Sequence, residues 1–453
     1  MGTTIIKIKR IILILGDILI LYSALILTLA LRYQQNWQNE WQNHFIPFSI
    51  IYLLWLLVFY ILGLYDLSLA RNNLYFFITL TKALAINAGL AVIFFYFIPF
   101  FGITPKTNLF INLAIFAILF VSWRQLYNLF IKNSALLNNV LIIGRNPETD
   151  ELIRYIKDNP QIGYRIKKIV DLKEVNLIFN LIEIITKEKI QIVVTSINPQ
   201  KNINLIQNLY QCIPLNIILA DLPAFYEKTT GKIPVSAIEE IWFLQNLMAD
   251  RKSFFELMKR AIDIAVSFIG GIITLSLLPI IALLIKINSS GPIFIRQKRV
   301  GQNNKIFNII KFRSMYALAP DGSAEKNGAE CAKEKDERIT RVGKFLRKIR
   351  LDELPQLWNV FRGDMTFVGP RPERPEFAFA GDLLEKIPFY QIRHILKPGL
   401  TGWAQIKYPY GSSIQDTLQK LQYDLYYVKN RGFILDLAII LKTIRTVLSA
   451  IGR

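Results

Sequence analysis

The chain has 453 residues, of which 52% are hydrophobic and 12% aromatic, and this composition is too apolar for an ordinary soluble enzyme of that length. Its net charge of +20 suits nucleic acid or anionic lipid headgroups, and the hydrophobic content favours the membrane, so we expect membrane lipid and no nucleic acid as partners. Only two cysteines, far apart, and two histidines argue against a disulfide framework and against a zinc or histidine-rich site.

Residues 1–135 are predicted to form an N-terminal transmembrane helix bundle. Four apolar stretches approach the length that crosses a bilayer: Ile11–Leu31, Ile46–Leu64, Leu74–Phe101 and Leu109–Phe130. The first stretch follows basic residues but has no small-residue cleavage site, so we expect it to be retained rather than removed as a signal peptide. The basic N-terminus, Arg71, Arg124 and Lys132 are expected on the cytoplasmic side. Asp17, inside the first span, is expected to face other helices because a carboxylate is costly in lipid.

Residues 136–250 change character and predict a Rossmann-like α/β domain. Short apolar runs predict strands, and the segments between them have helical composition. The expected strands are Val140–Ile143, Ile166–Val170, Ile190–Thr195 and Leu215–Ala220, and the helices are Glu148–Lys157, Val175–Glu188 and Asn202–Tyr210. This alternation is typical of a doubly wound parallel sheet. The first turn, from Gly144 to Pro147, lacks the glycines that let a backbone approach a pyrophosphate, so a structural or dimerising role is favoured over cofactor binding.

Residues 251–453 form the third predicted domain, and it opens with an apolar helix at 258–288. Ile264–Ile285 is long enough to span a bilayer, but Pro279 should kink it, and basic residues flank both of its ends. Because positive charge prefers the cytoplasmic side, we expect a re-entrant helix that breaks near Pro279 and keeps both ends in the cytoplasm. Further on, Leu318–Lys335 is expected to be a mobile surface loop or a lid, and Asp436–Ile451 an amphipathic membrane-surface helix or a packed core helix.

The main candidate site is the adjacent acid pair Asp352 and Glu353. Bases surround the pair in the sequence, at Arg347, Lys348, Arg350, Arg362 and Arg371. Carboxylates are hard ligands for Mg²⁺, and arginine binds phosphate oxygens through two parallel hydrogen bonds. A carboxylate can also act as a covalent nucleophile. The alternative interpretation makes Asp352 a helix N-cap and the bases an ordinary solvated face.

Five segments resemble the bacterial sugar transferase family, the polyprenyl-phosphate phosphoglycosyl transferases. They are RQKRVG from Arg296, KFRSM from Lys311, LDELPQLWNVFRGDM from Leu351, VGPRP from Val368 and KPGLTGWAQI from Lys397. The resemblance runs from about Phe254 to the C-terminus. It implies a C-terminal α/β-type catalytic domain with a re-entrant membrane helix, preceded in large members by a degenerate Rossmann-like domain. In the family a serine commonly precedes the helix-breaking proline, whereas here Leu278 precedes Pro279.

The resemblance implies transfer of a sugar 1-phosphate from a UDP-sugar to undecaprenyl phosphate, with release of UMP. Such a reaction begins exopolysaccharide, O-antigen or capsule assembly. Asp352 matches the nucleophile that forms a covalent aspartyl-phosphosugar intermediate, and Glu353 matches its partner, with both acids as ligands of Mg²⁺. Arg347 and Arg371 match phosphate-binding positions. Lys311 and Arg313 are further phosphate-binding candidates, with a structural ion-pair role as the alternative.

The resemblance also implies a bacterial cytoplasmic (inner) membrane protein whose catalytic domain lies on the cytoplasmic face. Glucose or galactose 1-phosphate is the usual group transferred by large members, and an N-acetylated sugar stays open. A homodimer through the middle domain is a further hypothesis. Two other classes of function remain as alternatives: a non-catalytic scaffold for polysaccharide assembly, and a membrane oxidoreductase that uses a nucleotide cofactor in the middle domain.

Overall fold

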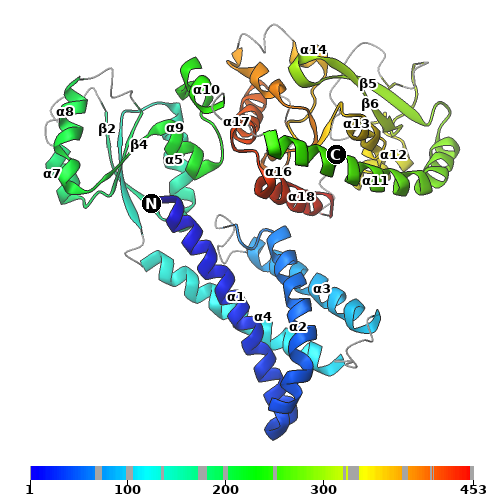
Figure 1. Ribbon diagram of the computed structural model, residues 1–453, viewed down its shortest axis with the longest axis horizontal. Helices are drawn as coiled ribbons and strands as arrows, with labels where there is room; N and C mark the ends of the chain where they lie inside the picture. Colours follow the sequence, from blue (N-terminus) through cyan, green and yellow to red (C-terminus); the bar gives the residue numbers. More distant parts are fainter. Residues whose placement is uncertain are drawn as a thin grey trace. The chain divides into compact units, whose positions relative to one another are not determined.

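The computed structural model describes residues 2–66, 74–97, 106–133, 137–171, 181–196, 203–247, 253–319, 323–324, 336–379, 386–408, 411 and 413–448. The chain divides into two compact units, 1–230 and 231–453 (Figure 1). The first unit contains the predicted apolar helices and the predicted sheet, and residues 231–247 group with the second unit. The domain boundaries at 135 and 250 stay predictions.

Four long helices form the apolar part of the first unit: α1 Gly2–Tyr33, α2 Trp37–Ile61, α3 Leu74–Phe97 and α4 Lys106–Asn133. Three stretches here are long and apolar enough to cross a membrane, and the first, Ile8–Ile61, contains both α1 and α2. Within it the two helices pack against each other, since the Tyr22 hydroxyl lies 2.8 Å from Ser49 Oγ. The apolar helices make this a membrane protein, as the sequence predicted.

Asp17 lies inside the bundle, as predicted, and Arg124 neutralises it. Arg124 Nη2 donates to Asp17 Oδ2 at 2.7 Å, and Nη1 donates to the Leu64 carbonyl at 3.1 Å. The Arg124 side chain is 1% exposed, so it is a buried partner of the carboxylate rather than the flanking charge that the sequence indicated. This pair joins α1 and α4 to the end of α2 and satisfies charges that lipid cannot solvate.

The rest of the first unit is a four-stranded parallel sheet in the order β2-β1-β3-β4, which confirms the predicted parallel pairing. Its strands are β1 Asn138–Ile143, β2 Tyr164–Val170, β3 Ile192–Thr195 and β4 Ile218–Asp221, and its helices are α5 Pro147–Asp158, α7 Leu181–Lys187, α8 Ile203–Gln211 and α9 Leu222–Thr230. β4 starts later than predicted because Ile213–Leu215, which contains Pro214, forms a 3-10 turn. Part of the predicted helix 175–188 lies outside the described residues.

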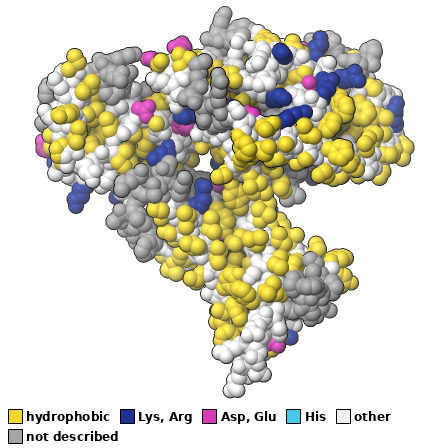
Figure 2. All heavy atoms as spheres, in the orientation of Figure 1, with side chains coloured by type: hydrophobic (Ala, Val, Ile, Leu, Met, Phe, Trp, Pro, Cys, Tyr) yellow, Lys and Arg dark blue, Asp and Glu magenta, His cyan; other side chains and the backbone are white. Residues whose placement is uncertain are grey.

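The first α-helices described in the second unit are α10 Glu240–Leu247 and the 36-residue helix α11 Ser253–Asn288. α11 continues through Pro279 without interruption, so the helix break predicted at this proline is not seen. An antiparallel hairpin follows, made of β5 Phe294–Val300 and β6 Ile306–Phe312. Gly270 of α11 lets α13 approach closely, because a Cβ atom at Gly270 would lie 2.8 Å from Leu357 Cδ1. The other side of α11 exposes large apolar side chains along its length (Figure 2).

The remaining elements complete the second unit. They are α12 Arg341–Lys348, α13 Gln356–Arg362, β7 Thr366–Val368, α14 Pro375–Ala378, β8 Gly399–Thr401, α16 Trp403–Lys407, α17 Ile414–Asn430 and α18 Phe433–Leu448. β7 and β8 pair in parallel and form a small second sheet. The helix predicted at 436–451 corresponds to α18. Most of the predicted loop 318–335 lies outside the described residues.

Candidate active site

Asp352 and Glu353 lie in a tight turn between α12 and α13. Leu351–Glu353 forms a single 3-10 turn, and the residue that caps α13 is Pro355, which has no side-chain capping bond. Asp352 is therefore not the N-cap of α13 that the alternative interpretation required. Arg350 enters the turn with a left-handed φ of 57°, a conformation that costs an L-residue about 1–2 kcal/mol and that is found at functional sites.

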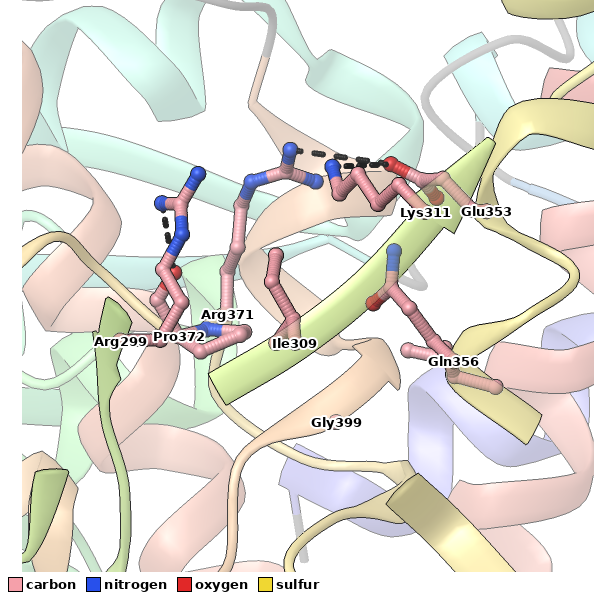
Figure 3. A pocket seen from close by; sticks show the side chains of 9 residues that line it. Arg299, Ile309, Lys311, Glu353, Gln356, Arg371, Pro372 and Gly399 are labelled. Atoms are coloured by element: carbon pink, nitrogen blue, oxygen red, sulfur yellow. Dashed lines mark hydrogen bonds and ion pairs between the residues drawn. The ribbon is translucent and has the colours of Figure 1, made fainter. Parts of the chain in front are cut away.

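Glu353 is surrounded by three cations that come from different segments. Lys311 Nζ on β6 lies 3.5 Å from Glu353 Oε1, and Arg371 Nη2, in the loop after β7, lies 3.9 Å from the same oxygen (Figure 3). Arg350 Nη1 lies 3.4 Å from Oε2. The structure therefore brings together three of the predicted site residues, Glu353, Lys311 and Arg371, although Lys311 precedes Glu353 by 42 positions and Arg371 by 60 in the sequence.

The two acids have opposite pKa shifts. Burial raises the pKa of Asp352, which is 8% exposed, and the charge of Glu353 raises it further, against the opposing effect of Lys311 and Arg347. Burial alone would also raise the pKa of Glu353, but Lys311, Arg371 and Arg350 outweigh it and lower that pKa to about 2. Glu353 is thus ionised at neutral pH, and Asp352 is the more basic carboxylate of the pair.

A small pocket adjoins the pair. It encloses about 250 Å³, part of which is open to solvent, and it is lined by Arg299, Ile309, Lys311, Glu353, Gln356, Arg371, Pro372, Gly399 and Leu400. Its charged lining, one carboxylate and three cations, suits the phosphate part of a larger ligand. Arg299 and Gln356 were not singled out from the sequence. Both fall within the segments that carry the family resemblance, and that was the signal available for them.

The two other predicted bases have different surroundings. Arg347 Nη1 is buried without a hydrogen-bond partner, and its charge acts on Asp352. Arg313 is buried and donates to the Ser289 carbonyl at 2.7 Å and to the Ser290 carbonyl, both just beyond α11. It is absent from the described lining of the pocket, and its contacts match the structural alternative for this residue.

Asp352 and Glu353 are also the candidate metal ligands of this site. The part of the chain that the structure describes holds no group of three or more His, Cys, Asp and Glu side chains with metal-binding geometry. Mg²⁺, however, is commonly held by one or two carboxylates together with substrate phosphates and water. Two adjacent carboxylates beside a pocket lined by three cations fit that donor set, so Asp352 and Glu353 could hold the metal when substrate is present.

Comparison with known proteins gives the same assignment as the motifs. The family model described as bacterial sugar transferase matches residues 254–450. Over 190 residues the chain is 39% identical to the exopolysaccharide production protein PSS of Rhizobium leguminosarum bv. phaseoli, and the match covers 41% of this chain and 93% of that protein. The chain belongs to the bacterial sugar transferase family. Every residue that lines the pocket lies inside the matched segment.

Two longer bacterial sugar transferases match a smaller part of their own length. The UDP-N-acetylgalactosamine-undecaprenyl-phosphate N-acetylgalactosaminephosphotransferase of Aeromonas hydrophila is 41% identical over 239 residues, which are 52% of this chain and 54% of the relative. The undecaprenyl-phosphate glucose phosphotransferase of Komagataeibacter xylinus is 41% identical over 192 residues, 42% of this chain and 35% of the relative. The chain thus spans about half or less of the length of these two relatives.

Proposed function

We propose that the protein transfers a sugar 1-phosphate from a UDP-sugar to undecaprenyl phosphate and so begins the assembly of a cell-surface glycan. The observation that carries this proposal is a buried carboxylate, Asp352, beside a small pocket whose charged lining is Glu353 and three cations. The Aeromonas and Komagataeibacter relatives are named for transfer to undecaprenyl phosphate, which supports that acceptor here. Their names include both N-acetylgalactosamine and glucose, so the sugar has to be identified by assay.

The chemistry requires two displacements at one phosphorus atom. In the first, an oxygen of Asp352 bonds to the phosphorus that bears the sugar, and the bond to UMP breaks, so that UMP leaves with the electron pair. In the second, a phosphate oxygen of the lipid bonds to the same phosphorus, and the bond to Asp352 breaks, which regenerates the carboxylate. Lys311, Arg347 and Arg371 would neutralise the phosphate oxygens so that an anionic carboxylate can approach.

Asp352 and Glu353 would hold Mg²⁺ in this proposal. When bound, Mg²⁺ supplies charge neutralisation between the carboxylates and the diphosphate. Glu353 suits this task because its lowered pKa keeps it ionised at neutral pH, and Lys311 and Arg371 hold its side chain from one side.

The contacts of α11 support a re-entrant helix with both ends on one side of the membrane. Near its start, Arg260 donates to the Val360 and Phe361 carbonyls of α13, at 2.7 Å each. Near its end, Asn288 Oδ1 accepts from the Val342 amide of α12 at 3.1 Å. In a straight helix Arg260 and Asn288 would lie about 42 Å apart, yet both are tied to short helices of one compact unit. The exposed apolar face between those ends would lie in the membrane, with the unit on the cytoplasmic face of the inner membrane.

The first turn of the sheet argues against the oxidoreductase alternative. Asn146 Oδ1 accepts from the Thr149 amide at 2.8 Å, and Thr149 Oγ1 accepts from the Asn146 amide at 2.8 Å. This capping box uses backbone donors that a pyrophosphate would need at the start of α5. We therefore keep the degenerate Rossmann-like assignment and propose that this domain forms a homodimer. The mass of the native protein in nanodiscs tests the dimer.

The deciding experiment measures UMP release by the full chain in nanodiscs with Mg²⁺, undecaprenyl phosphate and a panel of UDP-sugars. We expect release with one donor from the wild type and none from Asp352→Asn, because an amide cannot form the acyl phosphate. A folded wild type that releases no UMP from any donor would overturn the proposal and favour the scaffold.

A further inference from the structure

Arg299 lines the same side of the pocket as Lys311. Along a strand, alternate residues point to the same face, so Arg299 of β5 shares a face with Ile309 and Lys311 of β6 through the register that pairs Arg299 with Phe307. Figure 3 shows the side chains of Arg299, Arg371 and Lys311 in a row, with Glu353 at the Lys311 end. The cations thus extend beyond the acid pair, and Arg299 is the most distant of the three.

Of the three cations in this row, two lie beside a carboxylate and Arg299 forms its hydrogen bonds with neutral groups. Lys311 and Arg371 both lie within 4 Å of the Glu353 carboxylate. The hydrogen bonds of Arg299 go to neutral oxygens, the Pro372 carbonyl at 3.1 Å and Gln297 Oε1 at 2.6 Å, and its Nε is buried without a partner. Burial and then the nearby charge of Arg371 lower the pKa of Arg299 to about 10, and the charges of Glu373 and Glu353 oppose this only in part. An anion bound between the two guanidinium groups would satisfy the free donor and reduce their repulsion.

The proposed reaction supplies such an anion in both of its steps. Both displacements are in line at the same phosphorus. The group that leaves in the first step therefore lies opposite the Asp352 carboxylate, and the group that attacks in the second step must lie in the same place. Both groups are phosphates: that of UMP in the first step and that of the lipid in the second.

We propose that Arg299 and Arg371 form one subsite for this second phosphate, which the UMP phosphate and the lipid phosphate occupy in turn. The inference rests on the proposed function and adds to it a residue and a shared position for the two substrates. Arg299 moves no proton and forms no covalent bond. It binds the phosphate that is released or that attacks. Lys311 would neutralise the oxygens of the phosphorus that reacts, and Glu353 would hold the metal beside it.

The test compares Arg299→Gln with Lys298→Gln in the full chain in nanodiscs. Lys298 is the matched control because it is the neighbouring cation on β5, and it points to the opposite face of the hairpin. For Arg299→Gln we expect about a tenfold or larger rise in the KM for the UDP-sugar, in the KM for undecaprenyl phosphate and in the inhibition constant for UMP, since a lost charge-assisted hydrogen bond has an effect of this order. Lys298→Gln should leave all three near the wild-type values.

Inhibition by uridine separates phosphate binding from a structural role of Arg299. Uridine lacks the phosphate, so Arg299→Gln should weaken inhibition by UMP and leave inhibition by uridine unchanged. Equal weakening of both inhibitors would mean that the variant has only displaced the Arg371–Pro372 backbone, and would overturn the inference. A rise in the KM of the donor alone, or of the lipid alone, would overturn the shared subsite and assign Arg299 to that one substrate.

The two proposals fail in different ways. If the wild type releases no UMP from any donor, the function itself is wrong. If the wild type is active and Arg299→Gln keeps its KM values and its inhibition by UMP, the function stands and the subsite is wrong. Thermal unfolding of each variant checks that the protein is folded.

Discussion

Asp352 combines burial with a high density of surrounding charge, and its protonation should govern the reaction at low pH. Only the ionised carboxylate can attack phosphorus, so the rate should fall as the pH falls through the pKa of Asp352. Burial raises that pKa above its ordinary value, while Lys311 provides the largest opposing charge. The position of the acidic limb of the pH–rate profile therefore reports the environment of one carboxylate.

We predict that Lys311→Gln moves the acidic limb of kcat/KM to higher pH. Loss of the Lys311 charge removes the largest effect that lowers the pKa of Asp352, so this carboxylate takes up its proton at a higher pH. The measurement is kcat/KM against pH for UMP release, in which the position of the limb is compared rather than the maximal rate. Lys298→Gln serves as the control. A limb that stays in place or moves to lower pH contradicts this assignment of charges.

The left-handed conformation of Arg350 gives a second prediction. Arg350→Ala and Arg350→Gly both remove the charge that faces Glu353, but only glycine adopts a φ of 57° without steric cost. The free energy of unfolding of the glycine variant should therefore be about 1 kcal/mol higher than that of the alanine variant. Chemical denaturation in detergent measures the difference. If alanine is the more stable of the two, the turn does not hold the backbone in the left-handed region.

Among the elements, the loop after β7 is held in place by Arg393, which is not part of the described lining of the pocket. Arg393 lies in the 3-10 turn Tyr390–Ile395, and its Nη2 donates to the Arg371 carbonyl at 3.1 Å. The same nitrogen lies 2.7 Å from Asp424 Oδ2 on α17, and Nη1 donates to the Tyr390 hydroxyl at 2.9 Å. Arg393 is thus a positioning residue that joins α17 to the backbone of Arg371, which we propose to bind phosphate.

We predict that Arg393→Lys raises the KM for the UDP-sugar by about tenfold while kcat at saturation changes less. A lysine keeps the charge near Asp424 but cannot donate to all of these partners at once, so the Arg371 backbone loses its support. Steady-state kinetics with the UDP-sugar measure KM and kcat separately, and thermal unfolding checks that the variant is folded. Equal losses in kcat and kcat/KM would instead place the defect in the chemical step.

The elements also show what the sequence could predict. Apolar runs predicted the parallel strands because a buried strand needs apolar residues on both faces. The β5–β6 hairpin was not recognised, because three of the seven residues of β5 are basic and interrupt its apolar pattern. Lys311 and Arg313 are two positions apart and would share a face of a longer strand, but β6 ends at Phe312, and Arg313 turns to the carbonyls beyond α11. Strand pairing brings Arg299 to the pocket, and the start of α13 brings Gln356 there. Both residues were missed because the spacing of residues in the sequence does not reveal either arrangement.

For the whole molecule, the apolar bundle is predicted to depend on the Asp17–Arg124 pair. Asp17→Ala leaves the Arg124 charge buried without its carboxylate and should lower the free energy of unfolding by about 3–5 kcal/mol. The double variant Asp17→Ala/Arg124→Leu removes both charges and should regain part of this loss. Unfolding in detergent by denaturant or by heat measures both variants. A double variant that is less stable than Asp17→Ala would contradict a simple charge pair.

Helix α13 has a consequence for how the enzyme senses its surroundings. Its first residue, Gln356, lines the pocket, while Trp358, which is 56% exposed, and Phe361 lie on its outer side. The helix has seven residues and is only about 10 Å long. In the proposed re-entrant arrangement the membrane would lie against that outer side, and the length of α13 would then set the distance between the pocket and the hydrocarbon. Bilayer thickness and lipid packing should therefore alter turnover directly, in a protein whose pocket, acids and bases stay unchanged.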